Sequence, residues 1–284
     1  MASTISFEEF AAVSPCRDAV DRRKLLFVYR ALEDLAAERR AQVTDLSVLE
    51  FACGAGAVTL PLARTGARVR AVDTDRRSLD ALSNAASRAG FDNLSVTASD
   101  AVAFRGGERF DLVIASGVIE RAADPDALLA NVVHHLRPDG VVIVAAANGY
   151  GPRQLSSYLS PRSLARRWSR QRDGGDDAAG STVASRVRTR HFTPGSLVTL
   201  FHRNGLDVQR FMNSDFLFTI SKTLRSNPAI GSLDTELADL VPRWMASGWY
   251  VALRRGGPAG SGVPAMTTGK RVPFPAAQSL HGAP

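Results

Sequence analysis

Hydrophobic and polar positions alternate in blocks along the first half of the chain, as short apolar runs separated by amphipathic stretches. The short runs predict buried parallel strands, and apolar residues spaced three and four apart predict helices between them. Strands are expected over Ser47–Phe51, Arg68–Val72, Leu94–Ala98, Phe110–Ala115 and Gly140–Ala146. Helices are expected over Asp18–Arg40, Ala57–Arg64, Arg76–Ala89 and Asp126–Leu136. This alternation is typical of βαβ units and predicts a doubly wound, mostly parallel α/β sheet with helices on both faces.

The pattern changes after Asn148, where Gly, Ser, Arg and Asp become frequent. Regular structure is expected to resume with a helix over Pro194–Asn204, for which Thr193 is the cap. Two further strands are expected, over Leu206–Phe211 and Trp249–Leu253, with a helical patch at Leu233–Leu240 between them. We therefore divide the chain into an N-terminal helical cap (1–45), an α/β core (46–148), an Arg-rich insertion or lid (149–190), the C-terminal part of the sheet on the substrate side (191–255) and a disordered tail (256–284).

The net charge of +7 is concentrated in one segment, because Gly151–Arg190 holds nine arginines against three aspartates. Nucleic acid is one explanation of such a block. The segment has one Trp and one Tyr, without the aromatic series that stacks on single strands, so an arginine-rich surface is favoured. The two cysteines and an N-terminus without a secretory signal indicate a reducing, cytoplasmic location. No apolar run is long enough for a membrane-spanning helix.

The stretch Ser47–Leu60, SVLEFACGAGAVTL, reads as a strand, a glycine turn and the start of a helix. Gly54 and Gly56 allow backbone amides to approach a ligand without an intervening Cβ. The free amides and the positive dipole end of the helix face the same point. This combination is the ligand-binding corner of a doubly wound sheet.

Acidic or polar residues follow four successive strands at the same edge, namely Glu50, Asp73, Asp100 and Ser116. A carboxylate at Asp73 can accept both ribose hydroxyls, and one near the third strand can accept an adenine amino group. A diphosphate would be poorly served by Glu50 beside its binding amides. A dinucleotide fingerprint would also place glycine where Thr59 stands. The residues therefore favour a nucleoside ligand with a positive charge.

Several motifs together resemble the class I S-adenosylmethionine-dependent methyltransferases, in particular the branch with the ubiquinone-type O-methyltransferases. They are Glu50-Phe-Ala-Cys-Gly-Ala-Gly56, Asp73, Ser99-Asp100, the run Phe110–Ile114 and Leu136–Gly140. The resemblance covers about residues 46–148. It implies S-adenosylmethionine as cofactor, S-adenosylhomocysteine as product, and a seven-stranded sheet of Rossmann type that ends in an antiparallel hairpin.

The resemblance also implies which residues lie against the cofactor. They are Glu50, Ala52, Cys53, Gly54, Gly56, Asp73, Thr74, Asp100, Ala101 and Ser116. In this scheme Asp73 holds the ribose, Asp100 and Ala101 the adenine, and Ser116 borders the sulfonium. Two positions depart from the family pattern. Ala52 stands where many relatives have glycine, and Arg121 stands where many have histidine.

The expected reaction is in-line transfer of a methyl group to a hydroxyl of a small molecule or glycan. Removing the hydroxyl proton suits a histidine, and His191 is the first candidate because it opens the segment that follows the insertion. An ordinary surface role for His191 is the alternative. His134 and His135 are expected to complement the dipole at the end of a helix as charged groups. No His, Cys and carboxylate residues have metal-ligand spacing, so no metal is expected.

Other functions stay open at this point. A methyltransferase that acts on a small amine, or an NAD(P)-dependent oxidoreductase on a similar sheet, would use the same edge. A nucleic-acid methyltransferase is disfavoured because the sequence lacks an Asn/Asp-Pro-Pro-Tyr/Phe stretch after the fourth strand.

Overall fold

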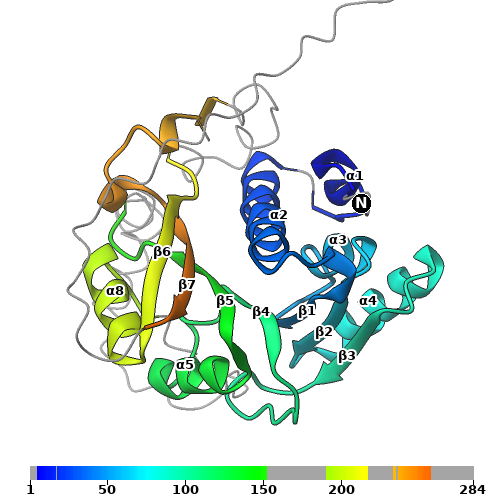
Figure 1. The fold of residues 1–284 in the computed structure, drawn as a ribbon. Coiled ribbons are helices and arrows are strands. Elements are labelled where there is room, and N and C mark those ends of the chain that lie inside the picture. The colour runs from blue at the N-terminus through cyan, green and yellow to red at the C-terminus, as the bar shows by residue number, and fades with distance from the viewer. Residues whose placement is uncertain (1–4, 17, 152–189, 217–232, 235, 257–284) are drawn as a thin grey trace, which may run out of the picture.

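The computed structural model describes residues 5–16, 18–151, 190–216, 233–234 and 236–256. Within these residues, seven strands form one sheet in the order β3-β2-β1-β4-β5-β7-β6 (Figure 1). The strands are β1 (Ser47–Phe51), β2 (Arg68–Asp73), β3 (Leu94–Ala98), β4 (Phe110–Ser116), β5 (Leu136–Ala147), β6 (Leu206–Asn213) and β7 (Gly248–Arg255).

The strands from the first half of the chain are all parallel, since β1 pairs with β2 and β4, β2 with β3, and β4 with β5. Strand β7 lies antiparallel between β5 and β6. Ser116 at the end of β4 pairs with Ala145, and Ala147 at the end of β5 pairs with Gly248 at the start of β7. The predicted sheet is thus confirmed, including its antiparallel hairpin. We call the edge where the parallel strands end the carboxyl edge.

Helices cover both faces of the sheet (Figure 1). One face carries α1 (Phe7–Ala11), α2 (Ala19–Arg39), α3 (Thr59–Arg64) and α4 (Arg76–Ala89), and the other carries α5 (Pro125–His134) and α8 (Pro194–Arg203). Short 3-10 turns, η1 (Val43–Asp45) and η2 (Arg243–Met245), precede β1 and β7. This arrangement leaves the carboxyl edge between the two layers of helices.

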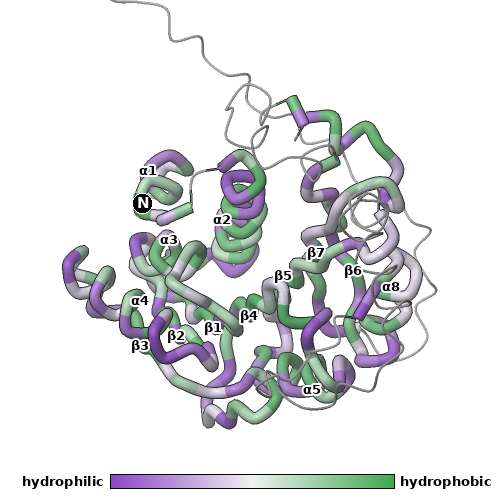
Figure 2. Tube along the Cα trace, turned by 180° about the vertical axis from the view of Figure 1, so that it is seen from behind, coloured by the Kyte–Doolittle hydropathy of each residue, from purple (hydrophilic) through white to green (hydrophobic). Residues whose placement is uncertain are grey.

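Each face of the sheet has its own apolar core, because successive residues of a strand point to opposite faces. Val48 of β1 packs in the cluster under α2, whereas Leu49 packs in the cluster under α5 and α8. Leu112 and Val113 of β4 divide in the same way. Figure 2 shows hydrophobic segments along the middle strands and both hydrophobic and hydrophilic turns in α2. Burial on both faces explains why these strands appear in the sequence as continuous apolar runs.

Most helix ends follow capping signals in the sequence. The side chain of Asp18 accepts a hydrogen bond from the Asp21 amide at the start of α2. Asp75 caps α4, and Gly90 ends that helix with a φ of 71°. Thr193 caps α8, as predicted.

The junction between α5 and β5 differs from the prediction. The helix expected over Asp126–Leu136 ends at His134, and Leu136 already pairs with Phe110 in the sheet. Leu136 is fully buried there, and Pro138 has no amide hydrogen with which to continue a helix. Burial in the sheet therefore takes precedence over the helical spacing at this position.

Other segments of the chain also differ from the prediction or lie outside the described residues. The pattern did not predict α1, although Ser6 and Glu9 form a capping box and Phe10 is fully buried. Helix α3 begins two residues later than the expected Ala57. Residues 152–189 of the predicted insertion and residues 257–284 of the predicted tail lie outside the described residues.

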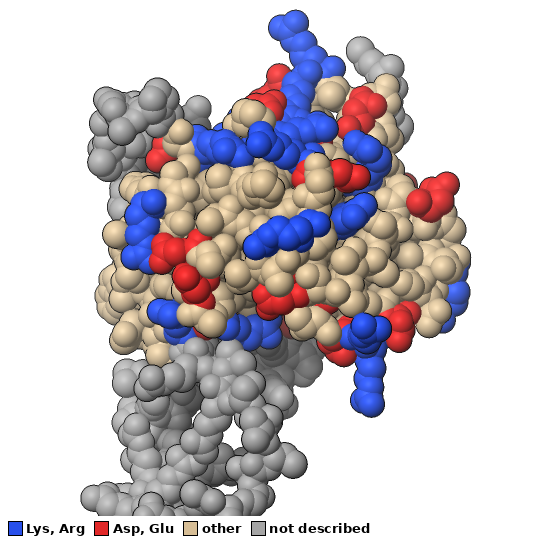
Figure 3. Space-filling view, turned by 90° about the horizontal axis from the view of Figure 1, so that it is seen from below, with Lys and Arg blue, Asp and Glu red and all other residues tan. Residues whose placement is uncertain are grey.

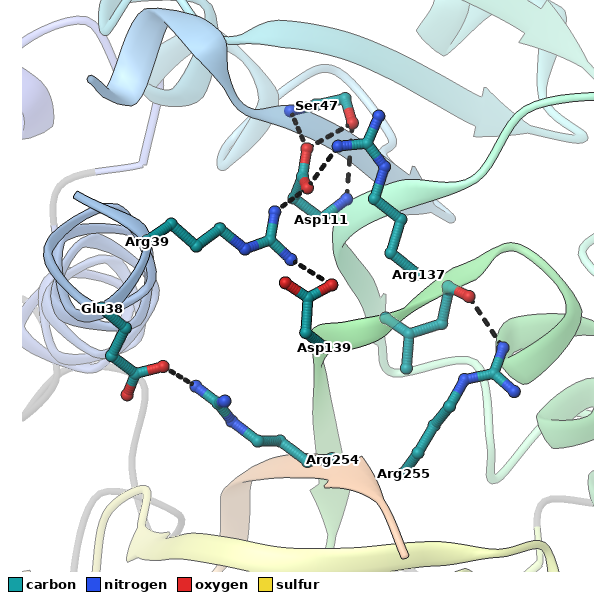
Figure 4. A network of polar contacts seen from close by, with 9 residues as sticks. Glu38, Arg39, Ser47, Asp111, Arg137, Asp139, Arg254 and Arg255 are labelled. Carbon is teal, nitrogen blue, oxygen red and sulfur yellow. Dashed lines mark hydrogen bonds and ion pairs between the residues drawn. The ribbon is translucent and has the colours of Figure 1, made fainter. Parts of the chain in front are cut away.

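A network of charges around the buried Asp111 joins α2 to the sheet at the edge opposite the carboxyl edge (Figure 4). Asp111, fully buried in β4, accepts hydrogen bonds from the amide and hydroxyl of Ser47 at 2.8 and 2.7 Å. Arg39 and Arg137 both bind its other carboxylate oxygen, and Arg39 also pairs with Asp139 at 2.9 Å. Burial raises the pKa of Asp111, but the hydrogen bonds outweigh it and lower the pKa overall. The carboxylate therefore stays charged and connects β1, β4, β5 and α2.

The face in Figure 3 carries Lys and Arg interspersed with Asp and Glu, so it is not a single-sign patch. Two surface ion pairs connect α2 to β6 and β7: Arg210 binds Asp34 at 2.9 Å, and Arg254 binds Glu38. Within the described part of the chain, no helix is both long and apolar enough to span a membrane.

Candidate functional site

The turn after β1 is built from residues in the left-handed region. Ala52, Gly54 and Gly56 have φ values of 53°, 53° and 91°. A Cβ on Gly56 would lie 2.5 Å from Cδ1 of Leu82, so this glycine packs against α4. A Cβ on Gly54 would meet no atom within 4 Å, so Gly54 faces open space. Ala52 carries a methyl group in a region that costs non-glycine residues about 1–2 kcal/mol. The turn therefore leaves the backbone of one glycine facing open space, at the expense of local strain at Ala52.

Asp73 ends β2 directly beside this turn. Its Oδ2 accepts a hydrogen bond from the Gly54 amide at 2.8 Å, and its Oδ1 accepts one from the Asp75 amide at 2.9 Å. Each carboxylate oxygen retains a second lone pair, and the side chain is half-buried. A ligand above Gly54 would therefore meet a fixed carboxylate with capacity for two further donors.

Asp100 lies near Asp73, but its side chain turns toward its own loop. The Ser99 amide donates to the Asp73 carbonyl at 3.0 Å, which brings the ends of β3 and β2 together. Oδ1 of Asp100 accepts from the amides of Val102 and Ala103 at 2.7 and 3.3 Å. The Asp100 residue is exposed at the carboxyl edge.

The other predicted site residues follow β1 and its neighbouring strands. Cys53 is buried, its amide donates to the Val72 carbonyl at 3.3 Å, and burial raises the pKa of its thiol. Thr74 is exposed beyond Asp73, and Ala101 is buried beyond β3. Ser116 is half-buried at the end of β4. These positions lie at the carboxyl ends of four neighbouring strands, β3, β2, β1 and β4.

Glu50 lies beneath the turn and is almost fully buried. Burial raises its pKa to about 7, while a hydrogen bond from Thr59 Oγ1 at 2.5 Å and the charge of Lys24 act in the opposite direction. The carboxyl group is therefore held between its neutral and charged forms near physiological pH. A cationic ligand beside it would favour the charged form.

We expect Glu50→Gln to change how stability depends on pH. Between the ordinary pKa of 4.5 and about 7, the unfolded chain is ionised at Glu50 whereas the folded protein keeps the proton. The free energy of unfolding of the wild type therefore falls as the pH rises through this window, by about 3 kcal/mol from this group alone. Glutamine cannot ionise, so urea titrations from pH 4 to 8 should show the variant gaining stability over the wild type. Parallel curves for the two proteins would contradict this.

His191 packs directly against the backbone that follows β5. The Gly149 amide donates to the Phe192 carbonyl at 3.3 Å, and a Cβ on Gly149 would lie 2.3 Å from Cβ of His191. The same Cβ would lie 2.5 Å from Nδ1, so Nε2 is the ring nitrogen directed away from this backbone. The imidazole is exposed, with the Tyr150 ring edge-on at 6.1 Å. His191, the predicted base, therefore lies at the carboxyl edge and is held there by its contacts with Gly149.

Glu120 is a residue of this edge that the sequence analysis missed. Its Oε1 binds the Ala147 amide, and its carbonyl oxygen accepts from the Arg190 amide at 2.7 Å. The side chain is 5% exposed, burial raises its pKa, and its Oε2 has no hydrogen-bond partner among the described residues. Glu120 thus joins the loop after β4, the end of β5 and the segment that carries His191. The adjacent Arg121 is exposed.

The other three histidines of the described residues, His134, His135 and His202, do not contribute to this edge. His135 is fully buried, and its Nε2 accepts a hydrogen bond from the Gly106 amide at 3.1 Å. A nitrogen that accepts carries no proton, so the expectation of a charged His135 is wrong. His134 and His202 are exposed on α5 and α8. In the described part of the chain, no three His, Cys, Asp or Glu side chains are placed to hold a metal ion.

Comparisons with known proteins agree with this geometry. Residues 49–142 match a protein family described as a methyltransferase domain. The ubiquinone biosynthesis O-methyltransferase of Caulobacter vibrioides is 30% identical over 143 residues, which are 50% of this chain and 55% of that protein. The protein of the same name from Cereibacter sphaeroides is 30% identical over 203 residues, 71% of this chain and 74% of its own. The match thus spans about half of the first relative and three quarters of the second.

The fold has a solved counterpart as well. An S-adenosylmethionine-dependent methyltransferase from Clostridium acetobutylicum superimposes with a TM-score of 0.50 at 15% identity, over 81% of this chain and 92% of that one. A likeness at this identity concerns the fold, and the sequence match to the Cereibacter protein concerns the family. The chain belongs to the class I S-adenosylmethionine-dependent methyltransferases.

Proposed function

We propose that the protein transfers the methyl group of S-adenosylmethionine to a hydroxyl group of a small molecule or a glycan. Family membership supports the cofactor, and two relatives named O-methyltransferases support a hydroxyl acceptor. The observation that carries the proposal is the Asp73 carboxylate fixed on the Gly54 amide, beside open space at the carboxyl edge. Two adjacent ribose hydroxyls would find two acceptor positions there.

Bound S-adenosylmethionine would supply a methyl group on a positively charged sulfur, which is reactive without further activation. Asp73 would orient the nucleoside through its ribose, and Gly54 would let the rest of the ligand approach the turn. Asp100 Oδ2 and Ala101 would lie toward the base, and Ser116 toward the sulfur. Glu50 would complement positive charge from beneath the turn.

The acceptor side would depend on His191. Its Nε2 would take the proton of the acceptor hydroxyl as the oxygen attacks, because its Nδ1 side lies against Gly149. Glu120 would keep the His191 segment at the carboxyl edge through the Arg190 amide. Alignment of the two reactants accounts for most of the rate enhancement in such a transfer.

Calorimetric titration and product analysis test the proposal together. We expect S-adenosylhomocysteine to bind and NAD to show no binding. Incubation with methyl-labelled cofactor and candidate acceptors should add one methyl group to oxygen, identified by mass and fragmentation. NAD binding without S-adenosylhomocysteine binding would instead indicate an oxidoreductase, and label on nitrogen would indicate an N-methyltransferase.

Asp73→Ala should weaken S-adenosylhomocysteine binding about 10- to 100-fold, because a pair of charge-assisted hydrogen bonds is lost. The matched control is Asp80→Ala, which removes an exposed carboxylate from α4 without touching the turn. Circular dichroism of both variants checks that the fold is intact. Equal affinity of the wild type and Asp73→Ala would refute the ribose role.

A further inference from the structure

Two exposed aromatic side chains, Tyr150 and Trp244, lie beside the proposed acceptor side. Among the described residues, five large hydrophobic side chains are exposed: Val96, Tyr150, Leu233, Leu240 and Trp244. Val96 lies on β3 at one end of the sheet, whereas Tyr150 follows β5 and Trp244 precedes β7. Tyr150 and Trp244 are 68% and 64% exposed, which is unusual for rings of this size.

The backbones of Tyr150 and Trp244 are both hydrogen-bonded to one buried side-chain amide. Asn148 is 2% exposed, and its Oδ1 accepts a hydrogen bond from the Tyr150 amide at 3.0 Å. Its Nδ2 donates to the carbonyl oxygens of Trp244 at 2.8 Å and Ala246 at 2.7 Å. A single side chain therefore fixes the backbones of both aromatic residues relative to each other.

Further contacts fix the backbone next to each of the two aromatic residues. The indole of buried Trp249 donates to the Arg243 carbonyl at 2.9 Å, and the Arg243 guanidinium lies 4.4 Å from the Phe211 ring centre. On the other side, a Cβ on Gly151 would lie 2.8 Å from the Ala246 carbonyl, so the chain after Tyr150 packs tightly against η2. Exposed aromatic residues whose backbones are fixed in this way are preorganised for contact with a ligand.

We propose that Tyr150 and Trp244 form a platform that binds the acceptor through the apolar face of a ring, and that Asn148 is its positioning residue. Aromatic side chains stack on flat or apolar faces, which phenols and pyranose sugars both present. The platform begins beside His191, whose ring lies 6.1 Å from that of Tyr150. A ring held there could bring a hydroxyl group within reach of Nε2. The inference rests on the proposed function only for the fate of that hydroxyl.

Binding to the protein saturated with S-adenosylhomocysteine tests the platform without turnover. The probes are catechol and methyl β-D-glucopyranoside, titrated by calorimetry against the wild type, Tyr150→Ala, Trp244→Ala and Trp244→Phe. Each alanine variant should weaken binding of the preferred probe about tenfold. Trp244→Phe, which keeps a ring, should recover much of the affinity. Val96→Ala removes an exposed apolar side chain elsewhere and should bind as the wild type does.

Asn148→Asp tests the positioning role. An aspartate of the same size faces two carbonyl oxygens without a donor, so it should weaken probe binding about as much as Trp244→Ala. Its affinity for S-adenosylhomocysteine should be unchanged, and in turnover the effect should appear in KM rather than kcat. An effect on both ligands would mean a general structural role for Asn148.

The outcomes separate the platform from the methyltransferase assignment. Probe preference distinguishes an aromatic acceptor from a sugar. If S-adenosylhomocysteine binds but neither probe does, or if both alanine variants bind the preferred probe normally, the platform is refuted and the assignment stands. If S-adenosylhomocysteine does not bind, the assignment fails, and binding of a probe to the unliganded protein still decides the platform.

Discussion

His191→Ala should lower turnover about 10²–10⁴-fold while leaving S-adenosylhomocysteine affinity unchanged, because the acceptor hydroxyl would lose its proton acceptor. Single-turnover measurements with saturating acceptor give the rate of the chemical step directly. The effect should be smallest at high pH, where more of the acceptor is already ionised.

His134→Ala is the control for this experiment, since it removes an exposed histidine from the end of α5. Gly149→Ala gives an independent approach, because its new methyl group would displace His191 from the position it occupies. We expect Gly149→Ala to slow the chemical step as well. Near-normal turnover in His191→Ala would reduce this histidine to a surface residue.

Asp111→Ala should destabilise the protein by about 3–5 kcal/mol, because it leaves Arg39 and Arg137 without the buried carboxylate that they share. The groups of Ser47 lose their acceptor at the same time. Urea unfolding, followed by circular dichroism at neutral pH, measures the loss.

Two neighbouring variants provide the scale. Ser47→Ala removes the hydroxyl that donates to the charged carboxylate and should cost about 1.5–3 kcal/mol. Asp139→Ala removes a mostly exposed partner of Arg39 and should cost at most about 1 kcal/mol. Because the pKa of Asp111 is lowered, its contribution is complete above the ordinary value of 3.8 and is lost as the pH falls below it. An Asp111→Ala loss no larger than that of Asp139→Ala would show that the network does not act as a unit.

The sheet could be predicted from the sequence because both faces of its middle strands are buried, which leaves an unmistakable apolar run in each strand. Helix ends with capping side chains, such as Asp18 and Thr193, were predictable because a cap bonds to the first turn of its own helix and so leaves a local signal in the sequence. Arg23 was not, since its charge places it on the polar side of α2. In the structure it is 2% exposed and donates to the Asn213 carbonyl at 2.9 Å. A partner from the far end of the chain leaves no local signal.

The site divides along the same line. Gly54 and Asp73 are recognisable because a turn and a strand end place them by local rules, and the structure brings them within 2.8 Å. Their contact with a cofactor stays a prediction. Glu120 and Asn148 escaped notice because their importance comes from segments that meet only in the folded chain. The predictions of an insertion, of a disordered tail and of an arginine-rich surface without nucleic acid concern residues that mostly lie outside those described.

The position of β7 has a consequence for biosynthesis. This strand is made last, yet it separates β5 from β6. While the ribosome is still translating the region between Ala147 and Gly248, β5 has an open edge and β6 has no neighbour to join. Unpaired edges of this kind attract strands from other chains. At roughly 5–20 residues per second, the nascent polypeptide keeps this edge unpaired for about ten seconds before its final strand closes the gap.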